Sequence, residues 1–425
     1  MGMGRMKKHT ISYVSFFMAV LLGLSACGDG SITGRHSMEP VAVLDYDVPA
    51  ALPSVMTDLT GYSLYAEKYA YLRVNETIGP VDIFSIRNLD QDRIVYEGAF
   101  EEAKGNDDLL KADFSDILSP GRYRIECETY GCSEEFEIAE DKYRRLSDEY
   151  RAGIMEQCRD LSATSQTVLE FLQAYEWYCS GNSEEVIVTE SVLPDAPEEL
   201  VAVRDWISGS DYSESVGTEA VIYAAILAKF SFLYKKYDSA LATECLQKAS
   251  SIYSQSNSVL KSDSESFRAL AELYRASGET AYYNELSAYK EYFSSNDDFL
   301  NNGYMYGAMT YVVTRQNVDK ELCDMLVNAI LAKAQTINNR RREITDPMSS
   351  QTSGREEMLD YLRVLLCANY ILKGYEYDLT VQRCLHYLAG LNVESDVYEP
   401  GSNNAGFFFL VYSCMGELEE EGKFH

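Results

Sequence analysis

The sequence predicts a multidomain β + α protein in which a β-sandwich precedes a larger domain of paired helices. Two patterns carry this prediction. Over residues 41–140, short apolar runs alternate with turn residues, which is typical of an all-β module. Over residues 141–425, apolar residues recur with the helical period in long stretches that contain few prolines. A chain of 425 residues is long enough for two or three domains.

The composition excludes some partners. The chain has 67 acidic and 37 basic residues and a formal net charge of −30. Such a surface repels phosphate backbones, so we expect no nucleic-acid partner. Strong acidity is typical of a solvated surface, and it indicates neither a specific ligand nor an oligomeric state.

Residues 1–26 are predicted to be a lipoprotein signal peptide. Basic residues precede the apolar run Ile11–Leu24, which is shorter than the about 20 apolar residues that a membrane-spanning helix needs. The run ends in Leu24-Ser25-Ala26-Cys27, which resembles the bacterial lipobox, whose cysteine is lipidated and becomes the mature N-terminus. The alternative is an ordinary secretion signal with a chance cysteine. Residues 27–40 would then form a tether, and Cys27 would anchor the protein to the outer face of the bacterial cell membrane.

The β-region contains several candidate strands. Alternating apolar residues predict a sandwich whose sheets each bury one face. The runs are Ala70–Val74, Val81–Ile86, Arg93–Gly98, Gly121–Cys127 and Glu134–Ile138.

Nine cysteines follow Cys27. Cys127 and Cys132 flank Glu-Thr-Tyr-Gly in a predicted hairpin and form the one plausible disulfide, although a reducing habitat would leave both as thiols. No CxxC pair or Cys/His spacing occurs, so no metal site is expected.

The helical region reads as a series of helices separated by short turn signals. Such helices pack as antiparallel pairs, which either close into an α/α toroid or extend into a solenoid, and periodicity does not decide between them. The predicted helices are Thr167–Tyr178, Thr218–Tyr234, Ser239–Tyr253, Ser264–Ala276, Thr280–Phe293, Tyr304–Val313, Lys320–Asn338, Arg355–Leu372, Tyr377–Leu388 and Gly406–Glu421.

Stretches of both regions match one known family. They include Ile94–Gly98, Pro120–Ile125, Leu169–Glu176 and above all Leu385–Asn392, which reads LHYLAGLN against the family's LHYLLGRN. The chain thus resembles glycoside hydrolase family 9, inverting cellulases with an N-terminal Ig-like domain and an (α/α)6 barrel. The resemblance implies a cellulase-type Ig-like sandwich over 41–140 and a shortened (α/α)6-barrel-like toroid over 141–425. It also implies a β-glucan or other polysaccharide as partner and no cofactor.

The family's catalytic residues are not found in this sequence. Inverting hydrolysis needs a general acid and a general base about 6.5–9.5 Å apart. The family's base lies in an Asp-Ala-Gly-Asp loop, which is absent, and the family's spacing from Ala174 places Glu156 as the candidate base. The family's His-Arg stretch and acid glutamate are also missing, and Glu394 and Glu399 read as ordinary loop carboxylates.

Other catalytic chemistry is poorly supported. His386 is the one histidine inside a predicted helix and reads as a packing residue, which leaves no histidine for catalysis or zinc binding. No phosphate-binding glycine loop and no nucleophile elbow occur.

Three functions remain open. The first is a surface lipoprotein of this fold that has lost catalysis and keeps a glycan-binding or structural role. The second is an active inverting β-glucanase whose acid and base have moved. The third is a helical adaptor, since Phe267–Tyr289 could pass for a tetratricopeptide unit, although no regular 34-residue repeat is present. The first is preferred.

Overall fold

A computed structural model describes residues 52–75, 77–103, 108–180, 195–210, 217–256, 263–296, 299–347, 354–399, 403–422 and 424. The predicted signal peptide, the tether and Cys27 lie outside these residues. Residues 51–425 form one compact unit. Among the described helices, none combines the length and the apolar character that a membrane span requires.

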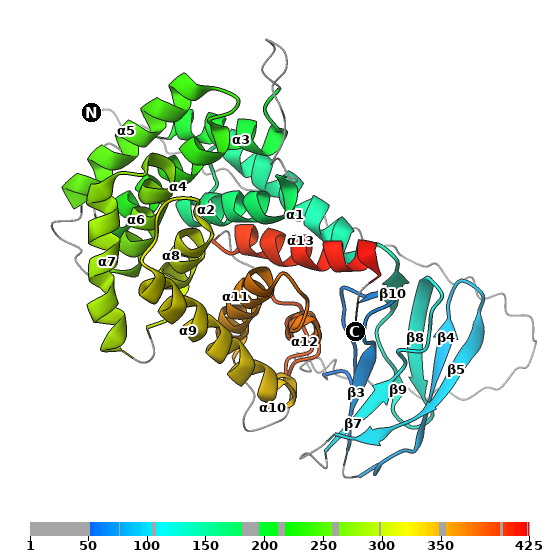
Figure 1. The fold of residues 1–425 in the computed structure, drawn as a ribbon. Helices are drawn as coiled ribbons and strands as arrows, with labels where there is room; N and C mark the ends of the chain where they lie inside the picture. Colours follow the sequence, from blue (N-terminus) through cyan, green and yellow to red (C-terminus); the bar gives the residue numbers. More distant parts are fainter. Residues whose placement is uncertain are drawn as a thin grey trace, which may run out of the picture. The chain divides into compact units, whose positions relative to one another are not determined.

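The β-region is a sandwich of two sheets, as predicted (Figure 1). One sheet has the order β1 (Val55–Met56), β3 (Tyr69–Arg73), β7 (Leu109–Asp113) and β6 (Glu101–Glu102). The other has the order β2 (Tyr62–Ser63), β10 (Phe136–Ala139), β8 (Gly121–Cys127), β4 (Ile83–Asn88) and β5 (Arg93–Ala99), with β9 (Gly131–Cys132) paired to β8. Alternate side chains such as Phe84, Ile86, Tyr123 and Ile125 fill the core between the sheets.

The predicted hairpin is present, and of the two alternatives left open for its cysteines, a disulfide or two thiols, the structure has Cys127 and Cys132 as free cysteines. In the β8–β9 register, Cys127 lies opposite Gly131, and Cys132 lies opposite Glu126. The two cysteines are therefore one residue out of register, and neighbouring residues of a strand face opposite sides of a sheet. Accordingly Cys127 is buried in the core and Cys132 is exposed.

The helical region is an α/α toroid. An inner ring is formed by α2 (Ser165–Ala174), α4 (Thr218–Tyr234), α6 (Ser264–Ser277), α8 (Asn302–Val313), α11 (Arg355–Leu372) and α13 (Ala405–Glu421). The outer helices are α1 (Lys142–Arg159), α3 (Glu198–Gly209), α5 (Ser239–Ser256), α7 (Thr280–Ser294), α9 (Lys320–Asn339) and α12 (Asp378–Leu388), with the short α10 (Arg341–Thr345) beside them.

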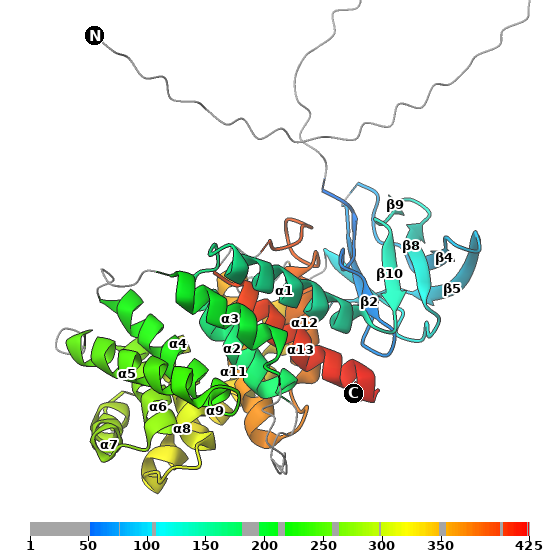
Figure 2. The same cartoon turned by 90° about the horizontal axis from the view of Figure 1, so that it is seen from above.

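The inner ring is closed rather than extended. Each inner helix packs against the next, and α13 returns to pack against both α2 and α11 (Figures 1 and 2). An outer helix carries the chain back before each inner one, so the inner helices run in the same direction. The structure thus decides for the toroid and against the solenoid that the periodicity left open.

Side-chain pattern explains which helices lie inside. The helix α4 has apolar or small residues on every side and buries all of Tyr223–Ser231. The helix α5 buries only Ala242, Cys245, Ala249 and Tyr253, a single stripe at helical spacing. A helix with one apolar stripe stays outside, because its other faces remain polar.

Candidate active site at the N-terminal ends of the inner helices

The resemblance places the family's base and acid in the connections that precede α2 and α13. These two inner helices lie side by side in the ring. Both connections enter the ring where the inner helices begin, so the candidate site is the face formed by these N-terminal ends.

The α1–α2 connection holds a single carboxylate, Asp160. Its Oδ1 accepts hydrogen bonds from the backbone N–H of Ser162 at 2.9 Å and from its hydroxyl at 2.6 Å. These bonds lower the pKa of Asp160. The carboxylate is thus used to shape its own loop.

The candidate base Glu156 lies on the outer helix α1 and not in a loop. The helix continues to Arg159, and the Glu156 side chain is exposed on its surface. The backbone carbonyl of Glu156 accepts the N–H of Asp160, which ends the helix. The structure does not bring Glu156 together with the buried carboxylates described below.

The α12–α13 connection holds its carboxylates in surface ion pairs. Glu394 lies 3.3 Å from the Arg355 guanidinium at the start of α11, and Asp396 contacts the same group. Asn392 fixes the loop by donating to the carbonyls of Tyr387 at 2.8 Å and Asp396 at 2.7 Å. Glu399 is exposed.

A group of buried polar side chains fills the ring axis behind this face. We call it the axial cluster, and its members are Glu170, Glu265, Arg268, Tyr306 and Arg363. They come from the inner helices α2, α6, α8 and α11. The sequence analysis did not predict this cluster. The one signal for it was the presence of charged residues inside helices that are otherwise apolar.

Ion pairs and ring contacts position the axial cluster. Arg363 Nη2 lies 3.5 Å from Glu170 Oε1 and donates to Asn404 Oδ1 at 3.1 Å. Arg268 stacks 4.6 Å from the centre of the Tyr306 ring and lies 3.9 Å from Glu265. Burial raises the pKa of both Glu170 and Glu265, while the neighbouring guanidinium groups act in the opposite direction.

Several buried atoms of this region lack hydrogen-bond partners among the described residues. They are Glu170 Oε2, Glu265 Oε2, Ser266 Oγ, Arg363 Nε and all three guanidinium nitrogens of Arg268. Buried polar groups normally find partners, so this arrangement suits water or the polar groups of a ligand. Donors and acceptors are both present.

A pocket opens beside the axial cluster, between α8, α9 and α11. This ring pocket has a volume of about 420 Å³ and is lined by Leu300, Asn301, Asn302, Met305, Lys333, Glu357, Asp360, Tyr361 and Val364. The Tyr361 hydroxyl donates to Glu357. Asp360 also lies 3.4 Å from Arg363 Nη1, which connects the pocket wall to the axial cluster.

A second charged network lies at the opposite ends of the inner helices. Lys229 donates to Gln173 at 3.0 Å and lies 3.2 Å from Glu272, and Glu176 pairs with both Lys229 and Arg275. Burial raises the pKa of Glu176, but Arg275 and Lys229 outweigh burial and lower it to about 2. These ion pairs join α2, α4 and α6, and Arg275 Nε is the one buried atom of the named groups without a hydrogen-bond partner among the described residues.

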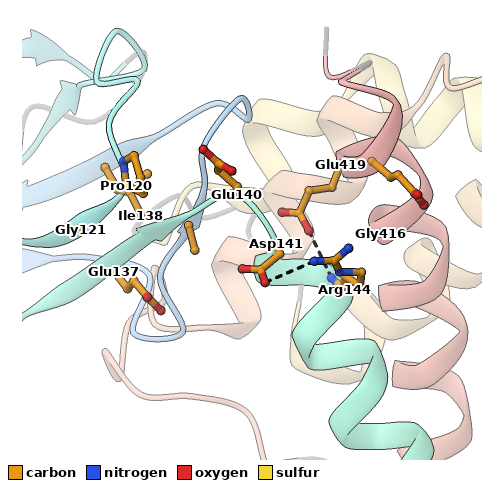
Figure 3. A pocket seen from close by; sticks show the side chains of 11 residues that line it. Pro120, Gly121, Glu137, Ile138, Glu140, Asp141, Arg144, Gly416 and Glu419 are labelled. Carbon is orange, nitrogen blue, oxygen red and sulfur yellow. Dashed lines mark hydrogen bonds and ion pairs between the residues drawn. The ribbon is translucent and has the colours of Figure 1, made fainter.

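Another pocket lies at the junction of the sandwich and the toroid. It has a volume of about 500 Å³ and acidic walls, with Glu137, Glu140, Asp141, Glu419 and Arg144 among its lining residues (Figure 3). Glu419 accepts the backbone N–H groups of Tyr143 at 3.0 Å and Arg144 at 3.2 Å. This carboxylate therefore caps α1, whose first turn is a favourable place for negative charge.

No group of three or more potential metal ligands occurs among the described side chains. His386 is fully buried between the sandwich and the toroid, where its Nδ1 contacts Asp58.

Comparisons with known proteins agree with this architecture. Residues 50–131 match the family model of the cellulase N-terminal ig-like domain. No curated protein shows significant similarity to the chain.

Solved structures to which the chain is similar include family 9 glycoside hydrolases. A metagenome-derived family 9 endoglucanase is 18% identical, with a TM-score of 0.65, over 82% of this chain and 85% of that one. A family 9 protein of Bacteroides ovatus is 13% identical, with a TM-score of 0.65, over 86% and 99% of the two chains. An endoglucanase of Alicyclobacillus acidocaldarius is 15% identical, with a TM-score of 0.58, over 80% and 82%.

The chain therefore has the fold of the family 9 glycoside hydrolases: a cellulase-type Ig-like sandwich followed by the helical toroid. The expected resemblance is confirmed at this level.

Proposed function

We propose that this chain is a glycan-binding surface protein built on the family 9 fold, which binds β-glucan without hydrolysing it. The observation that carries this proposal is the pairing of Glu170 with Arg363 on the ring axis. The only fully buried carboxylate of the axial cluster thus serves a structural ion pair, and the unpartnered donors around it suit hydroxyl groups.

Charge balance favours a neutral sugar over an anionic one. The two guanidinium groups of the axial cluster face two carboxyl groups, Glu170 and Glu265. An additional buried charge would have no counter-ion and would be costly to desolvate. Sugar hydroxyls can satisfy both the donors and the acceptors without adding charge.

The ring pocket supplies the open part of the proposed site. It combines the half-buried ring of Tyr361 with carboxylate, amide and ammonium groups. Apolar ring faces with a few polar groups are typical of ligand sites, and sugars present both kinds of surface.

Hydrolysis is the second candidate, and one observation favours it. The Glu265 side chain is 15% exposed, and burial raises its pKa, as a general acid requires. In this case Glu265 would protonate the leaving oxygen, and a second carboxylate would activate water.

One experiment separates the two candidates. Retardation in gels that contain neutral β-glucan measures binding, and release of reducing ends from the same polymer measures hydrolysis. We expect retardation that Tyr361→Ala weakens and that Tyr65→Ala, at an exposed tyrosine of the sandwich, leaves unchanged. Release abolished by Glu265→Gln or Glu156→Gln would establish hydrolysis, and no retardation of the unsubstituted protein would overturn the binding proposal.

We further propose that Cys27 anchors the protein to the outer face of the bacterial membrane. The lipobox-like Leu24-Ser25-Ala26-Cys27 supports this. Labelled fatty acid fed to expressing cells should enter the protein, and Cys27→Ala should prevent its incorporation. Equal labelling of both proteins would overturn the anchor.

A further inference from the structure

A second pocket lies between the sandwich and the toroid, away from the N-terminal ends of the inner helices. This seam pocket has a volume of about 260 Å³. Its walls come from β3, β6 and β7 of the sandwich and from α10, α12 and the residue after α10 of the toroid. Ligand pockets often form where two domains meet.

Tyr71 provides the aromatic surface of the seam pocket, and the buried Tyr69 supports it from behind. Tyr69 and Tyr71 are arranged edge to face with 5.4 Å between ring centres. Burial raises the pKa of both phenols, so each hydroxyl stays protonated and can both donate and accept a hydrogen bond. Lys111 lies 4.8 Å from the centre of the Tyr69 ring, which fixes the ring in place.

Two basic groups of the seam pocket, Arg383 and Lys111, are already neutralised and held in position. Arg383 makes two hydrogen bonds to Glu67, at 2.9 and 2.7 Å, and Lys111 lies 3.1 Å from the same carboxylate. The Arg383 bonds use Nε and Nη2 and leave Nη1 for another partner. Side chains that are fixed before binding lose little conformational entropy when a ligand arrives.

We propose that the seam pocket binds the end of a short neutral oligosaccharide. Arg342 adds a donor and the exposed Glu101 and Glu102 add acceptors. With Asp346, the lining holds three acidic and three basic side chains, so it has no excess positive charge for an anion. Ring faces beside fixed hydrogen-bonding groups match the apolar faces and hydroxyls of a sugar ring. The pocket volume limits the bound part to one or two sugar residues.

Titration calorimetry with cellotetraose tests this site independently of the ring pocket. We expect two sites in the unsubstituted protein. Tyr71→Ala should weaken one of them about tenfold, because it removes an aromatic contact. Tyr71→Phe should keep the ring contact and lose less affinity, and circular dichroism should show both variants folded.

The two sites can fail separately. If Tyr71→Ala abolishes all binding and Tyr361→Ala has no effect, the seam site stands and the proposed ring site is wrong. If Tyr71→Ala leaves both the number of sites and their affinities unchanged, the seam proposal is overturned. Tighter binding of an oligogalacturonate than of cellotetraose at this site would overturn its assignment to neutral sugars.

Discussion

The Nδ1 atom of His386 lies 2.7 Å from Oδ2 of Asp58, although 328 positions separate the two residues. Lys142 Nζ lies 3.1 Å from the same oxygen, and all three side chains are buried. One carboxylate of the sandwich therefore contacts an outer helix at the start of the toroid and another near its end.

Replacing this carboxylate should weaken the junction. Asp58→Asn should destabilise the protein by about 3–5 kcal/mol, because it leaves the buried Lys142 ammonium without its counter-ion. Urea unfolding measures the effect. Asp92→Asn is the matched control, because Asp92 is 93% exposed and its ion pair with Arg87 contributes little. Equal midpoints for the two variants would contradict this role of Asp58.

Glu176 should make stability depend on pH. Its pKa falls from an ordinary value of 4.5 to about 2 in the folded protein. A lowered carboxyl pKa adds stability above the unfolded value, and this contribution is lost as the pH falls from about 5 towards 2. Glu176→Gln should reduce the loss of stability over this interval relative to the unsubstituted protein. Parallel pH profiles of unfolding free energy would disprove the assignment.

Arg363 and Glu170 should show coupled energetics. Arg363→Met should lower the free energy of unfolding by about 3–5 kcal/mol, because it leaves the fully buried Glu170 carboxylate without its ion-pair partner. Glu170→Gln together with Arg363→Met should cost less than the sum of the two single changes. The coupling is read from unfolding free energies in a double-mutant cycle, and additive values would show that the pair does not interact.

Gly406 permits the close approach of α13 to α2. A Cβ atom there would lie 2.3 Å from the Thr167 carbonyl oxygen and 3.0 Å from Glu170 Cβ. Gly406→Ala should therefore destabilise the protein by about 1–3 kcal/mol. Gly153→Ala is the matched control in α1, where nothing lies within 4 Å, and it should be neutral or slightly stabilising. Thermal unfolding of the two variants compares them directly.

The two hairpin cysteines should react at different rates. Burial raises the pKa of Cys127 to about 11, whereas Cys132 is exposed. A thiol reagent should label Cys132 in the folded protein and Cys127 only after unfolding. A reducing agent should leave the thermal midpoint of unfolding unchanged. A lower midpoint in the reducing agent would show that the two cysteines form a disulfide.

Local sequence pattern predicted many of the longer helices and strands. Thr218–Tyr234 and Arg355–Leu372 match α4 and α11 to the residue, and Gly121–Cys127 matches β8. Two-residue strands such as β1 and β6 were not predicted, because they are too short to show alternation. The helices α1 and α3 were not assigned individually, although the helical period was expected from residue 141 onward.

The candidate site was far less predictable. Counting along the family's spacing led to Glu156 because it assumed a loop where α1 continues. The axial cluster depends on ring closure, which brings Glu170 of α2 against Arg363 of α11. Nothing in the local sequence around either residue identifies its partner, and closed-ring contacts follow only from the arrangement of all the inner helices.

Closure of the ring by α13 also determines when the toroid can fold during synthesis. The helix that completes the ring, α13, is the last of the toroid in sequence, and it packs against α1 and α2, which are the first. The surface of α2 that faces α13 thus stays uncovered until α13 has been synthesised. Such long-range contacts slow folding, so the toroid should become protected only in a late step, when its first and last inner helices meet.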